Sequence, residues 1–142
     1  MKDIMLKIVG KQIISEAEEE DQIEFVTEGK LYEKNGATYL VYEETEVSGM
    51  PGCKTSLKID GDTIRMKRFG EGVGNDTVME FQRGQRFEGY YDTPFGAIEM
   101  EVLTNKLENT LTPKGEGCVR IDYDISLKGL SEGRSVLSIE II

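Results

Sequence analysis

The chain of 142 residues contains no histidine and no tryptophan, and it has only two cysteines. The absence of histidine excludes Ser-His-Asp and Cys-His catalysis and every His-ligated metal site. No apolar run approaches the roughly 20 residues of a membrane-spanning helix, and lysines interrupt the apolar residues near the N-terminus, unlike a signal peptide. We therefore expect a cytoplasmic, reducing location, where Cys53 and Cys118 remain thiols by default, although the sequence leaves a disulfide open.

Acidic residues outnumber basic ones by 27 to 17, which gives a net charge of −10. This excess disfavours nucleic acids and anionic membranes as partners, because both are bound through Lys and Arg. The pairs Asp60/Asp62 and Asp122/Asp124 each share a strand face. Acid–base catalysis by such pairs requires burial, and the second pair lies opposite an apolar face, so we expect it to be exposed. No catalytic residue, metal site or cofactor is predicted.

Apolar and polar residues alternate along most of the chain, with turn residues between the runs. Asn35-Gly36 separates two such runs and predicts a hairpin, because both central residues of a type I′ turn need positive φ. A second hairpin is predicted around Gly84. The acidic segment 16–21 is expected to be a solvated connection, and the glycine-rich segment 70–76 a flexible loop.

The regular spacing of strands and turns predicts an all-β fold of about nine or ten strands. Leu103, Leu107 and Leu111 recur at a helical spacing, but Pro113 weakens that alternative. Nearly every connection is short and sequential, which indicates an antiparallel meander. Since an open meander leaves two long edges, we expect residues 1–142 to form a single barrel domain, with about 8–10 strands, whose first and last strands meet.

Ordered short motifs add a family resemblance. They occupy residues 25–32, 39–44, 66–70, 91–96 and 121–124, and include Met66-Lys67-Arg68-Phe69-Gly70 and Ile121-Asp122-Tyr123-Asp124. In this order they resemble the YwiB-like family of small bacterial β-barrel proteins. The resemblance implies a closed lipocalin-like (calycin-like) barrel and cytoplasmic residence. It implies no activity, so no catalytic residue is carried over.

One polar cluster is predicted inside the barrel. Arg68 continues the apolar face of Ile64 and Met66, so alternation directs it inward. A buried guanidinium needs a carboxylate partner, and Glu43 and Glu44 offer one to each face of their segment. The cluster could hold an anionic ligand inside or at the mouth of the barrel. A structural ion pair that closes one barrel end is the alternative. The predicted ligand-binding residues are Arg68, Glu43, Glu44, Tyr42 and Tyr39.

Three functions follow from these observations. The first is binding of a small amphipathic or anionic molecule in or at the mouth of the barrel. The second is a protein–protein interaction module with a solid core, and the third is a histidine-independent enzyme, for which the sequence offers least. The expected partner is a small molecule, rather than nucleic acid or a membrane. The sequence does not indicate the oligomeric state, or whether the interior is open or filled.

Overall fold

The computed structural model describes residues 2–14, 19–44, 53–70, 77–93, 96–112, 114–128 and 131–142. This part of the chain contains ten strands and no helix, and therefore no helix that could cross a membrane. The strands are β1 (Lys2–Ile14), β2 (Glu19–Lys34), β3 (Ala37–Glu43), β4 (Cys53–Asp60), β5 (Thr63–Gly70), β6 (Thr77–Gln82), β7 (Arg86–Thr93), β8 (Gly96–Asn109), β9 (Cys118–Leu127) and β10 (Ser131–Ile141). The predicted all-β class and strand number are confirmed.

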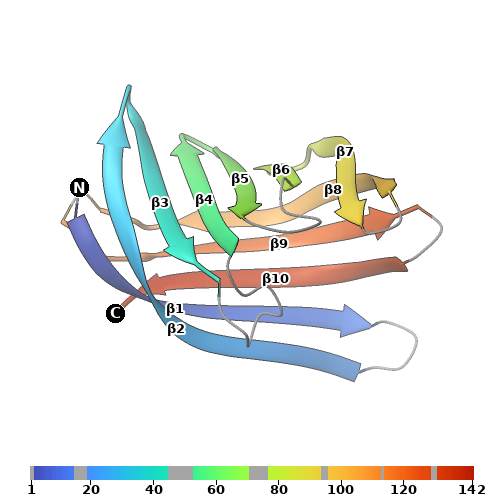
Figure 1. Ribbon diagram of the computed structural model, residues 1–142, viewed down its shortest axis with the longest axis horizontal. Coiled ribbons are helices and arrows are strands. Elements are labelled where there is room, and N and C mark those ends of the chain that lie inside the picture. The colour runs from blue at the N-terminus through green and yellow to red at the C-terminus, as the bar shows by residue number, and fades with distance from the viewer. Residues whose placement is uncertain are drawn as a thin grey trace.

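All ten strands belong to one antiparallel sheet, in the order β6-β5-β4-β3-β2-β1-β10-β9-β8-β7. Two meanders, β1–β6 and β7–β10, are joined because β1 pairs with β10, from Leu6 opposite Ile141 to Ile13 opposite Arg134. The sheet curls into a nearly closed barrel (Figure 1). The first and last strands therefore meet, as the sequence predicts.

The seam of the barrel is the gap in strand pairing between β6 and β7, which are the two ends of the sheet. The predicted hairpin around Gly84 is wrong, because no ladder joins these two strands within the described residues. Their connecting turn instead bonds to β8. The Gly84 N–H donates to the Thr104 carbonyl at 2.9 Å, and the Thr104 N–H donates to the Gln85 carbonyl at 3.3 Å.

The turn between β2 and β3 confirms the Asn35-Gly36 hairpin, with φ of 53° and 81° at its central residues. The helical alternative around Leu103 and Leu107 is wrong, since both residues lie in β8. An irregularity in register between Thr104 and Lys106 shifts the alternation there. Of the expected acidic connection, residues 19–21 belong to β2 and 16–18 lie outside the described residues. Gly70 ends β5, and the rest of the predicted flexible loop, 71–76, is likewise outside them.

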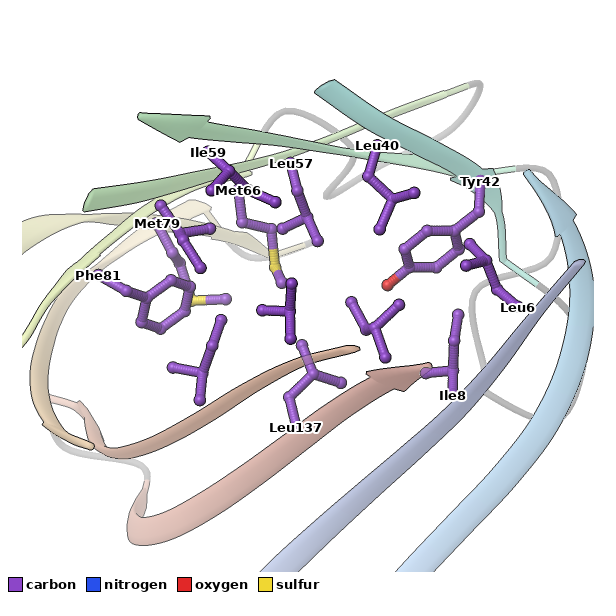
Figure 2. Close-up of a cluster of buried hydrophobic side chains, with 14 of the residues drawn as sticks. Leu6, Ile8, Leu40, Tyr42, Leu57, Ile59, Met66, Met79, Phe81 and Leu137 are labelled. Atoms are coloured by element: carbon purple, nitrogen blue, oxygen red, sulfur yellow. The ribbon is translucent and has the colours of Figure 1, made fainter. Parts of the chain in front are cut away.

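Apolar side chains fill the middle of the barrel. Leu6, Leu40, Leu57, Ile64 and Phe81 are completely buried, and side chains from opposite walls meet in one cluster (Figure 2). Burial of each such side chain contributes about 1.5–3 kcal/mol. The interior is therefore filled by the protein's own side chains along this stretch. Both cysteines, Cys53 at the start of β4 and Cys118 at the start of β9, are thiols.

Candidate functional site

A row of polar side chains crosses the inner face of the sheet near one end of the barrel. Tyr42 pairs with Thr55, Thr55 with Arg68, and Arg68 with Thr77, so that four neighbouring strands each contribute one residue. At this end β3 and β5 finish and β4 and β6 begin, and we call it the barrel mouth. Because side chains at paired positions lie on the same face of a sheet, the register alone brings these four together.

Glu44 follows β3 directly and supplies the carboxylate of the row. Its N–H donates to the Cys53 carbonyl at 2.8 Å, which ties its backbone to β4. Its side chain is only 3 % exposed, and the Arg68 Nε lies 3.9 Å from its Oε1. The Thr55 hydroxyl donates to the same oxygen at 2.6 Å. The structure thus brings together three of the five predicted site residues, Arg68, Glu44 and Tyr42.

The other two predicted residues lie elsewhere. Glu43 is exposed and stands opposite Lys54 on the outer face. Tyr39 is half-buried on that face and stacks on Tyr32, with ring centroids 5.0 Å apart and an angle of 2° between the rings. Both alternate with inward residues of the same segment. Neither belongs to the row at the mouth.

Two buried polar atoms in the row have no hydrogen-bond partner within the described residues: the Arg68 Nε and the Thr77 hydroxyl. An unmade hydrogen bond of a buried group costs about 1–3 kcal/mol. The Arg68 side chain is 21 % exposed, so solvent reaches part of it, although its Nε is buried. The mouth therefore holds donors that an added acceptor would satisfy. Sequence reasoning missed Thr55 and Thr77, because only the pairing of strands places them beside Arg68.

Two buried phenols face the same guanidinium. Burial, and then the charge of Glu44, raise the pKa of Tyr42, against the opposing effects of Arg68 and Thr55. Burial also raises the pKa of Tyr123, on β9 of the opposite wall, while Arg68 opposes the shift. Both groups are therefore neutral at physiological pH and can donate a hydrogen bond. The sequence places Tyr123 on an apolar face, and nothing in that pattern indicates its proximity to Arg68.

Asp122 corrects another expectation, because it is 6 % exposed rather than open to solvent. It accepts hydrogen bonds from Arg134, at 2.9 Å from Nε and 2.5 Å from Nη2, and from Asn105 at 3.4 Å. The hydrogen bonds from Arg134 are the main cause of its lowered pKa. The expectation for Asp124, which is exposed, is confirmed. Asp122 thus belongs to an ion pair on the outer face, away from the barrel mouth.

The chemistry available at the mouth is hydrogen bonding and charge. Among the described residues, the Arg68 guanidinium and the hydroxyls of Tyr42 and Thr77 can donate. The Thr55 hydroxyl already donates to Glu44, whose carboxylate balances the cation. Within the described residues, no group of three or more His, Cys, Asp or Glu side chains is placed to hold a metal ion. Such an arrangement suits the recognition of an anionic group.

The family described as a domain of unknown function (DUF1934) matches residues 6–139. The chain belongs to this DUF1934 family. It is 28% identical over 115 residues to the "Uncharacterized beta-barrel protein YwiB" of Bacillus subtilis (strain 168), covering 81% of this chain and 77% of the relative. The crystal structure of the ywiB protein from Bacillus subtilis superposes with a TM-score of 0.75 at 22% identity, covering 99% and 93% of the two chains. The resemblance to the YwiB-like family is confirmed, and the DUF1934 barrel is shared with a solved fold.

Proposed function

We propose that this DUF1934 protein binds a small anionic molecule at its barrel mouth, with Arg68 as the anchor. The observation that carries the proposal is a pair of buried polar atoms, the Arg68 Nε and the Thr77 hydroxyl, that have no hydrogen-bond partner in the part of the chain that the structure describes. The two residues lie directly opposite each other in β5 and β6. An oxyanion that accepted hydrogen bonds from both would remove two unmade bonds at once. Charge-assisted hydrogen bonds of this kind are about twice as strong as neutral ones.

The filled interior limits what such a molecule can be. Apolar side chains from both walls occupy the middle of the barrel (Figure 2), so the apolar part of an amphipathic ligand would lie at the mouth rather than along the axis. Glu44 stands 3.9 Å from the Arg68 Nε and already balances much of its charge. A singly charged group such as a carboxylate is therefore favoured over a polyphosphate, whose added charges would face Glu44.

Cytoplasmic residence is part of the same proposal. Both cysteines of the chain are thiols, which supports a reducing compartment. A cytoplasmic protein meets small carboxylates and phosphates in solution, and the mouth would select among them by charge.

Calorimetric titration with two probes, octanoate and inorganic phosphate, tests the proposal. We expect octanoate to bind the wild-type protein more tightly than phosphate does. R68M should weaken octanoate binding at least ~10-fold, since losing one charged hydrogen bond costs about 1.5–3 kcal/mol. T77V should weaken it by a smaller factor.

R65M is the matched control, because Arg65 lies on the same strand, is exposed, and points to the outer face. It removes the same charge and should leave the affinity unchanged. Equal losses of octanoate affinity in R65M and R68M would show that only the net charge of the protein matters. Absence of a binding heat from both probes with the wild-type protein would overturn the proposal.

A second candidate, a protein–protein interaction module, is supported by the solid core and by exposed apolar side chains on the outer face. Met5, Val26 and Ile142 are each 40–60 % exposed. Single exposed apolar residues need no explanation, but a group of them marks a contact surface. The two functions use opposite faces of the sheet and do not exclude each other.

A further inference from the structure

A large hollow lies on the outer face of β1, β2 and β3, and we call it the outer hollow. Its volume is about 1090 Å³, and its lining includes Met5, Val26, Val41 and Ile142. Three of these, Met5, Val26 and Ile142, are among the five exposed large hydrophobic residues of the described chain. Three of the five exposed large hydrophobic residues of the described chain thus gather in one place, while Ile23 and Tyr90 lie elsewhere.

The charges around the outer hollow are balanced. Asp3 lies 3.6 Å from Lys30 across β1 and β2, and Glu43 stands opposite Lys54 across β3 and β4. Among the described residues that line it, three are lysines and three are acidic: Lys2, Lys30, Lys54, Asp3, Glu28 and Glu43. The chain as a whole carries a charge of −10, so this neutral rim is a place where two copies can approach without strong repulsion.

We propose that the outer hollow is the contact surface of a homodimer. In a two-fold interface the same patch meets itself, so each lysine of one rim must find an acid on the other. A rim with equal numbers of both signs meets that condition, whereas a strongly acidic or strongly basic partner would gain little from it. The outer hollow mixes apolar and charged side chains, as protein interfaces do: Glu28 lies opposite Met5, and Val26 lies opposite Lys7.

The expected association is weak. Sixteen residues line the outer hollow, fewer than the roughly 20–30 residues per side of a standard stable interface. A dissociation constant in the micromolar range is therefore expected, and the dimer should form and dissociate with concentration. This inference is independent of anion binding, because Arg68 lies on the inner face.

Sedimentation equilibrium of the full chain across the micromolar range tests the inference. We expect the wild-type protein to show a reversible monomer–dimer equilibrium. V26E places a charge among the apolar residues of the outer hollow and should weaken dimerisation at least ~10-fold, which corresponds to a modest loss of association free energy. Y90E is the matched control, since Tyr90 is also exposed on the outer face, but on β7, away from the outer hollow.

A charge swap tests the rim itself. K30E should weaken the dimer, and D3K/K30E should restore it, because the double variant again has equal numbers of both signs. Far-UV circular dichroism checks that each variant is folded. A wild-type protein that stays monomeric throughout would overturn the inference, as would a dimer unaffected by V26E. A double variant no better than K30E would show that charge balance does not hold the copies together.

Discussion

Glu44 shows how a single residue is held at the barrel mouth. Its buried carboxylate has one short hydrogen bond, from the Thr55 hydroxyl at 2.6 Å. The Arg68 Nε, at 3.9 Å from the same oxygen, attracts it by charge but is too far away to donate. A buried charge without partners is costly. The hydrogen bond from Thr55 therefore contributes more to stability than the small size of threonine indicates.

The variant T55V tests this division of roles. Valine matches the shape of threonine but removes the donor to Glu44, and hydrogen bonds to charged groups contribute about 1.5–3 kcal/mol. We expect the free energy of unfolding in urea to fall by about 2 kcal/mol. S56A, on the outward-facing neighbour in the same strand, is the control and should change little. A loss in T55V no larger than that in S56A would mean that Arg68 alone stabilises the carboxylate.

The sequence predicts part of this cluster for a clear reason. Alternation within one strand gives the face of each residue, and it correctly directs Arg68 and Tyr42 inward. It does not give the neighbouring strands or their register, which decide that Thr77 lies beside Arg68. Alternation also leaves Glu43 and Glu44 as alternative partners of Arg68. In the structure the alternation of β3 continues just past its last residue, so Glu44 faces inward.

At the scale of strands, β8 shows where alternation fails. Its inner face carries Met100, Val102 and Thr104, and after the irregularity at Asn105 the next residue packed against the core is Leu107. One extra residue changes the phase, as in a β-bulge, so that Leu103 lies opposite the exposed Asp124 while Leu107 lies opposite the buried Ile121. Asn105, displaced by this change, donates to Asp122 on β9. Outward-facing is thus not the same as exposed.

The Asp122–Arg134 pair joins β9 to β10 and should make stability depend on pH. The pKa of Asp122 is lowered in the folded protein, so its contribution is complete above the unfolded value of about 3.9 and is lost as the pH falls through the folded value. Because Arg134 is 46% exposed, we expect D122N to cost only about 1 kcal/mol at neutral pH. Urea titrations at a series of pH values measure this.

The difference between wild type and D122N should stay constant from neutral pH to about pH 5 and shrink below about pH 4. D124N is the comparison on the same strand: Asp124 lies directly opposite Arg134 but is exposed, so its effect at neutral pH should be smaller than that of D122N. A D122N difference that persists unchanged in acid would show that the pair acts through packing rather than charge.

At the scale of the whole molecule, the barrel is closed between β1 and β10 and open between the consecutive strands β6 and β7. Because a long meander must cover its edges, the sequence correctly predicts that β1 meets β10. It cannot place the seam, because a tight turn normally joins paired strands. Here the turn after β6 forms hydrogen bonds with Thr104 of β8 instead. The position of the seam therefore depends on residues that are distant in the sequence.

The seam should be the least protected part of the sheet. Within the described residues β6 and β7 each pair with one strand only, whereas β3 pairs with both β2 and β4. Amide hydrogen exchange reports local opening, and an edge strand has a row of unpaired N–H groups. We therefore expect amides of β6 to exchange faster than those of β3, a fair control because the two strands have six and seven residues. Hydrogen-exchange mass spectrometry would resolve both. Since Thr77 begins β6, faster exchange there would also place the proposed anion site beside the part of the barrel that opens most readily. Equal protection of the β6 and β3 amides would mean that the seam is closed in solution.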